Sequence, residues 1–176
     1  TFPPTVVSVS ALGDVIGICF DEQLDDTSAS DPTNYVLAGG GTVASAELQP
    51  DGQTVVLGVS GLEGATFTVV INNVEDLAGN AIAADTQANG TIEPGVAAQD
   101  IGEPAISGSV YSCAPGRYVV TGGGDAFADN TGDQMFFVSE TITGDFDKRA
   151  RISSITASDG IDNWARGGLM ARGDNA

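Results

Sequence analysis

The sequence predicts an all-β protein, and three features carry that prediction. Short runs rich in β-branched and aromatic residues recur at intervals of about ten residues, which is typical of β-sandwiches. Glycine, proline and aspartate separate these runs and mark turns. No window shows the 3.6-residue apolar periodicity of an amphipathic helix, so we expect helices to be short or absent. The strands expected in the first half are 5–10, 14–20, 34–37, 42–48, 53–59 and 65–71.

The second of these runs indicates which of its faces is buried. Ile16, Ile18 and Phe20 lie on one face, because successive side chains of a strand point to opposite sides. Gly17 and Cys19 fall on the other face. We therefore expect the core on the side of the two isoleucines.

A change in composition divides the chain into two expected units. Residues 86–99 are rich in glycine, proline and alanine, which is typical of a connector. The expected organisation is a first unit over 1–93, a linker over 94–99 and a second unit over 100–176. In the second unit we expect a glycine-rich loop at 122–124 and strands at 108–111, 117–121, 134–142, 146–155 and 163–172.

The charge balance excludes several functions. The 176 residues contain 24 acids, 6 bases and no histidine, for a formal net charge of −18. Such a chain repels nucleic acid and anionic membrane surfaces, and no apolar stretch is long enough to cross a membrane. Without histidine there is no imidazole base and no histidine-bound metal. Residues 1–93 carry 13 of the acids and none of the bases, which also favours two units.

The first unit resembles a known family in two motifs. An Asn-Tyr strand follows Asp31 and Pro32, and the unit closes with Asn73-Val74-Glu75-Asp76-Leu77-Ala78-Gly79-Asn80. With the intervening strands, residues 3–92 resemble the bacterial Ig-like domains of S-layer and other surface proteins. The resemblance implies a seven-stranded Ig-like β-sandwich that serves as a spacer. Asp76 and Asn80 are expected to hydrogen-bond the turn between them.

The second unit is similar to another family. The Gly144-Asp145-Phe146 turn and the Gly168–Arg172 strand resemble the concanavalin-A-like jelly-roll domains related to a regulator of enolase. Those domains are about twice as long as the segment here. The resemblance therefore implies a partial jelly roll, either a fragment of a longer polypeptide or a fold that another chain completes, because a half jelly roll leaves strand edges uncovered.

An acidic loop is the candidate calcium site. Its Asp and Asn side chains are of the kind that supply oxygen ligands to Ca²⁺, and the alternative is a solvated turn in which they cap backbone groups. The candidate ligands are Asp125, Asp129, Asn130 and Asp133. A second oxygen-rich stretch contains Asp159, Asp162 and Asn163.

Three residues are candidates for carbohydrate binding. The rings of Trp164 and Tyr118 could stack on a sugar while Arg166 grips its hydroxyl groups. The alternatives are that Trp164 is a core residue and that Arg166 pairs with a local aspartate.

The two cysteines, Cys19 and Cys113, fall in different expected units. In an oxidising compartment they could form a disulfide across a loop of about 94 residues, which the loop-entropy model values at about 4–5 kcal/mol. The alternative for Cys19 is an ordinary small strand residue.

These observations predict a non-catalytic, extracellular or cell-surface bacterial protein, a spacer followed by a carbohydrate-binding or adhesion module. No catalytic residues are expected, since a glycosidase needs two carboxylates across the scissile bond and Glu140 is the only acid within an apolar strand. The expected partner is a glycan or other surface polymer, with Ca²⁺ as the only cofactor considered. The alternatives are a subunit of a surface fibre or layer that assembles by β-strand complementation, and an accessory module of a secreted hydrolase.

Overall fold

The computed structural model describes residues 2–124, 132–157, 165–171 and 173. The chain divides into two compact units, Thr1–Glu140 and Thr141–Ala176. All the strands of the described residues belong to the first unit.

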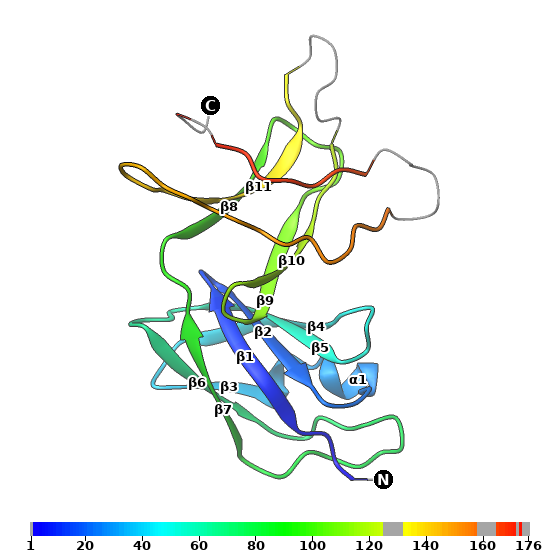
Figure 1. The fold of residues 1–176 in the computed structure, drawn as a ribbon. Helices are drawn as coiled ribbons and strands as arrows, with labels where there is room; N and C mark the ends of the chain where they lie inside the picture. The colour runs from blue at the N-terminus through cyan, green and yellow to red at the C-terminus, as the bar shows by residue number, and fades with distance from the viewer. Residues whose placement is uncertain (1, 125–131, 158–164, 172, 174–176) are drawn as a thin grey trace. The chain divides into compact units, whose positions relative to one another are not determined.

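Seven strands of the first unit form one sheet (Figure 1) in the order β3-β6-β7-β1-β2-β5-β4. Neighbouring strands are antiparallel, except that β1 and β7 pair in parallel. The sheet curls into a nearly closed, sandwich-like barrel, in which the edge strands β3 and β4 approach each other. The strands are β1 (Val6–Leu12), β2 (Val15–Phe20), β3 (Tyr35–Ala38), β4 (Thr42–Leu48), β5 (Thr54–Ser60), β6 (Thr66–Ile71) and β7 (Thr86–Ile92).

The all-β prediction is confirmed, and so is the expectation of short helices. A four-residue helix, α1 (Asp26–Ala29), and a 3-10 helix at Pro32–Asn34 lie between β2 and β3. The side chain of Asp25 caps α1 by accepting a hydrogen bond from the Ser28 backbone N–H at 2.9 Å, which satisfies a donor that the helix leaves free.

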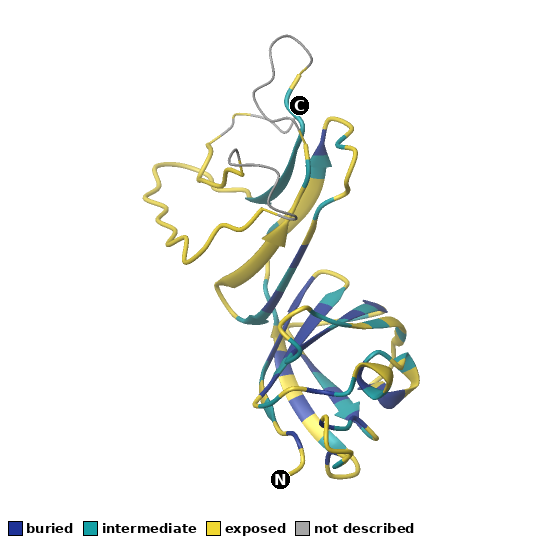
Figure 2. Ribbon diagram, turned by 90° about the vertical axis from the view of Figure 1, so that its right-hand side faces the viewer, coloured by how far each residue is buried: buried dark blue, intermediate teal, exposed yellow. Residues whose placement is uncertain are grey.

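The core lies inside the curled sheet, as Figure 2 shows by the dark colour of its inner face. Ile16, Ile18 and Leu57 are fully buried there. The expected burial of the isoleucine face of β2 is thus confirmed. Each such side chain contributes about 1.5–3 kcal/mol through removal from water.

Strand β7 corrects the prediction of a connector over residues 86–99. Its inward positions include Ala88 and Gly90, which have low strand propensity. Packing explains the glycine, because a Cβ at Gly90 would overlap the ring of Phe67 on the neighbouring strand β6. A glycine in a strand marks such a close approach, and here composition pointed to a loop although the ladder continues.

Four further strands follow in the first unit: β8 (Val96–Ile101), β9 (Ser109–Ala114), β10 (Arg117–Thr121) and β11 (Met135–Glu140). They form two two-stranded ladders, β9 with β10 and β8 with β11. The expected linker over 94–99 is therefore corrected, because residues from 96 onward pair with β11. The jelly-roll resemblance stays a prediction.

The second unit differs from expectation. Strands were predicted at 146–155 and 163–172, yet the described residues of both ranges belong to no strand. A strand is defined by its ladder to a neighbour, and here the alternating pattern is present without one. Phe146, Ile152 and Leu169 are more than half exposed.

No helix among the described residues has the length and apolar character required to cross a membrane.

We predict that Gly90→Val destabilises the first unit by about 1–3 kcal/mol, because the new side chain must displace the buried Phe67 ring. The matched control is Gln87→Val, which adds a valine at an exposed position of the same strand and should change the free energy of unfolding little. Urea denaturation of the two variants makes the comparison, and equal stabilities would contradict the packing described.

Candidate interaction surface

Strand β9 lies across the face of the seven-stranded sheet at β1 and β2 (Figure 1). Gly17 of β2 makes this approach possible, because a Cβ at that position would overlap the backbone carbonyl of Ser112 in β9. Ser112 is almost fully buried by the contact. The glycine thus places the β9–β10 hairpin on the sheet.

A disulfide holds the same contact. Cys19 of β2 is bonded to Cys113 of β9, with 5.7 Å between their Cα atoms and a sequence separation of 94 residues. Cys19 and Gly17 lie on the same face of β2, opposite the core isoleucines. The bond therefore joins the outer face of the sheet to the hairpin.

The carboxylate of Glu93 links the end of β7 to the hairpin. Its Oε1 accepts hydrogen bonds from the Ser112 hydroxyl at 3.3 Å and from the Gly116 backbone N–H at 3.2 Å. The buried Ser10 hydroxyl of β1 donates to the same oxygen at 3.4 Å. The Tyr118 hydroxyl of β10 donates to Oε2. One carboxylate thus contacts donors on β1, β9, β10 and the hairpin turn, while the Ser112 hydroxyl also has the Ala114 carbonyl as an acceptor at 2.7 Å.

This arrangement shifts the pKa of the Tyr118 hydroxyl. Burial, the hydrogen bond to Glu93 and the negative charges of Glu93 and Glu140 raise the pKa of Tyr118 from 10.0 to about 12. Each of these effects disfavours the phenolate. The hydroxyl therefore stays protonated and donates its hydrogen bond to Glu93.

The outward part of the hairpin is the first candidate surface, which we call the β10 face. All five residues of β10 are exposed, as the yellow arrow in Figure 2 shows. Val119 and Val120 have about half of their surface in contact with solvent (47% and 49%). In the described residues β10 pairs only with β9. An apolar edge strand of this kind is a template for pairing with another chain.

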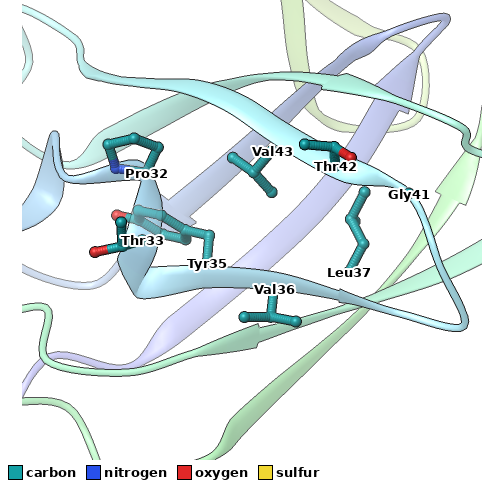
Figure 3. A pocket seen from close by; sticks show the side chains of 8 residues that line it. All are labelled: Pro32, Thr33, Tyr35, Val36, Leu37, Gly41, Thr42 and Val43. Carbon is teal, nitrogen blue, oxygen red and sulfur yellow. The ribbon is translucent and has the colours of Figure 1, made fainter.

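The second candidate surface is the β3–β4 groove (Figure 3), an open hollow of about 290 Å³ between the two edge strands of the sheet. Three successive glycines connect the strands, and all have positive φ (94°, 109° and 99° at Gly39, Gly40 and Gly41). No ladder joins β3 to β4 among the residues that the structure describes. The groove is lined by Pro32, Thr33, Tyr35, Val36, Leu37, Gly41, Thr42 and Val43.

The candidate carbohydrate residues fall in different parts of the chain. Tyr118 is on β10 of the first unit, its hydroxyl bound to Glu93 and its side chain 41% exposed. Arg166 belongs to the second unit, and Trp164 lies outside the described residues. Sugar binding by these three residues stays a prediction.

The candidate calcium site is described only at Asp133, a half-buried residue shortly before β11. The other candidate ligands lie outside the described residues: Asp125, Asp129, Asn130, Asp159, Asp162 and Asn163. In the part of the chain that is described, no group of three or more acidic or cysteine side chains is arranged to hold a metal ion. Calcium binding stays a prediction.

The structural role expected for Asp76 and Asn80 is confirmed. Asp76 Oδ1 accepts from the backbone N–H groups of Ala78 and Asn80, both at 2.8 Å. Its Oδ2 accepts from the Asn80 side-chain amide at 2.7 Å. These hydrogen bonds, first that of the Asn80 side chain, lower the pKa of Asp76, so its carboxylate stays charged while it holds the turn.

Sequence reasoning missed the roles of Gly17 and Glu93. Gly17 did carry a signal, since a glycine inside a β-branched strand indicates close approach of another backbone. Glu93 carried none, because it lies at the start of a segment whose composition resembles a linker.

Solved structures of other proteins resemble the fold of this chain. No family model matches the chain, and no curated protein matches it. Domains 1-6 of the surface layer protein SbsC match 82% of this chain at 20% identity and a TM-score of 0.50. The S-layer protein rSbsC(31-844) matches 66% of it at 24% identity and a TM-score of 0.46. CopC from Methylosinus trichosporium OB3b matches 51% at 14% identity and a TM-score of 0.38.

This chain spans only part of the S-layer structures, 24% of the first and 19% of the second, and 93% of CopC. At 20% identity, the match to domains 1-6 shows a shared β fold. Activity and partners do not follow from a fold alone.

We predict that replacing both cysteines (Cys19→Ser with Cys113→Ser) lowers the free energy of unfolding by about 2–5 kcal/mol, because the unfolded chain regains the freedom of a long loop. Urea denaturation with and without a reductant tests this. The reductant should destabilise the wild-type protein and leave the double variant unchanged. A wild-type protein indifferent to reductant would contradict the disulfide.

We also predict that Tyr118 is the tyrosine of the hairpin that responds to Glu93. In Glu93→Gln the pKa of Tyr118 should fall below about 12 but stay above 10, because the acceptor loses its charge while burial, the largest cause of the shift, remains. Ultraviolet titration of the phenolate measures the shift, and Tyr118→Phe identifies the step. An unchanged titration in Glu93→Gln would show that the contact is absent in solution.

Proposed function

We propose that the chain is a non-catalytic module of an extracellular or cell-surface protein, in which the first unit acts as a spacer. The disulfide between Cys19 and Cys113 carries this proposal. Disulfides persist in oxidising compartments and are rare in the cytosol. This one also ties the hairpin to the sheet, which suits a spacer that must keep its shape.

The chemistry of the chain supports a non-catalytic role. The sequence has no histidine. Two of its carboxylates in structured regions, Glu93 and Asp76, are engaged in hydrogen bonds that hold a hairpin and a turn. Their contribution is to the fold.

The shared fold with domains 1-6 of a surface layer protein also supports the proposal. That protein uses the fold in a surface layer, as its name says, and the acidic surface of the present chain suits a soluble exterior.

Two measurements on the producing cells test the proposal. Antibodies against the chain should label intact cells or the medium, and alkylation under denaturing conditions should find both cysteines blocked until a reductant is added. Free thiols, together with labelling only after lysis, would overturn it.

A second candidate function is that of a subunit of a surface fibre or layer that assembles through β-strands. The free edges of β3, β4 and β10 favour it. Carbohydrate binding is a further proposal, supported by the exposed ring of Tyr118. A glycan array probed with the wild-type chain and with Tyr118→Ala tests it, and equal signals from both would reject a role for this residue.

A further inference from the structure

We propose that residues 146–155 of one copy bind as an added β-strand at the β3–β4 groove of a second copy. This inference rests on the second candidate function, assembly through strands, and names its donor and its acceptor.

The donor segment has the pattern of an amphipathic strand. Phe146, Lys148, Ala150 and Ile152 would share one face of an extended chain, which therefore carries three apolar residues and one lysine. Asp147 and Arg149 share the other face, consistent with the ion pair between Arg149 Nη2 and Asp147 Oδ2 at 2.7 Å.

Apolar side chains of this segment are in contact with water. Phe146 is 56% exposed, Ile152 52% and Ile155 51%. No ladder includes residues 146–155 in the structure. A segment with strand pattern and exposed apolar groups gains from pairing, because main-chain hydrogen bonds form while the apolar face leaves water.

The acceptor offers the complementary features. Within the described part of the chain, β3 pairs only with β6 and β4 only with β5, so each presents an outer edge without a ladder. Addition of an extended peptide to such an edge uses the main-chain groups for affinity and side-chain pockets for specificity. Of the apolar residues that line the groove (Figure 3), Val36 is exposed and Val43 is half-buried, whereas Leu37 belongs to the core.

The distribution of charge favours the β3–β4 groove over the β10 face as the acceptor. Residues 1–93, which build the groove, carry 13 acids and no base. Asp31 is exposed beside the groove, just before the 3-10 helix whose residues Pro32 and Thr33 line it. The donor carries three of the six bases of the chain, Lys148, Arg149 and Arg151, whereas the β10 face begins with Arg117. Opposite charges steer association and oppose the wrong pairing.

Donor and acceptor are different surfaces, so the contact between copies is heterologous. Such contacts generate rings if the rotation closes and open filaments if it does not. The inferred pairing therefore accounts for growth beyond a dimer, as a fibre or layer requires.

Sedimentation velocity of the full chain, from low to high micromolar concentration, tests the inference. We expect the wild-type protein to associate as concentration rises and to dissociate as salt is added, because screening weakens the charge attraction. A wild-type protein that stays monomeric throughout would overturn it. That result would leave surface location, which is measured on cells, untouched.

Two variants test the donor segment and the groove separately. In the donor variant, Lys148, Arg149 and Arg151 are each replaced by Glu. In the acceptor variant, Val36→Lys puts a positive charge at the groove on a residue that is 55% exposed. Each variant alone should weaken association about tenfold or more.

The matched control is Val7→Lys, which places the same charge on β1 at a valine that is 65% exposed and does not line the groove. It should associate like the wild type. Circular dichroism verifies that all variants are folded. Equal weakening by Val7→Lys and Val36→Lys would overturn the assignment of the groove.

A mixing experiment distinguishes pairing between copies from pairing within one copy. The donor variant keeps an intact groove, and the Val36→Lys variant keeps an intact donor segment. An equimolar mixture should form 1:1 dimers and stop there, at a concentration at which each weakened variant alone stays monomeric. A monomeric mixture would overturn the exchange of residues 146–155 between copies.

Discussion

The first unit depends on a single close approach, that of the β9 backbone to Gly17 of β2. Any side chain at this position would meet the Ser112 carbonyl, so only glycine lets the hairpin lie on the sheet. The disulfide between Cys19 and Cys113 and the hydrogen bonds of Glu93 act on the same contact. Sterics permit the approach, and the covalent bond and the carboxylate then hold it.

This contact has a consequence for how the molecule meets other chains. With β9 held on the sheet, β10 is left with an outer edge and an exposed apolar face. At the two edges of the seven-stranded sheet, β3 and β4 each pair on one side only among the described residues. A rigid unit with several free edges is suited to joining through main-chain pairing, and its acidic surface restricts the strands that it accepts.

Much of the fold could be predicted from the sequence, because β-branched alternation and turn residues act locally. The core face of β2 was read correctly from Ile16 and Ile18. Strand β7 was missed because Ala88 and Gly90 are set by the Phe67 ring, a contact between strands that composition does not reveal. The strands expected at 146–155 and 163–172 show the reverse, a local pattern without a ladder among the described residues. The sequence allows a bond between its two cysteines, but whether they meet depends on the geometry that brings β9 to β2.

Hydrogen exchange of the oxidised protein tests the central claim most directly. If β9 is part of the sheet unit, the amides of Val110 and Ser112 should exchange as slowly as those of Ile16 and Ile18 in β2. Exchange of β9 at the rate of an exposed loop, while β2 stays protected, would show that the hairpin is detached and would contradict the account.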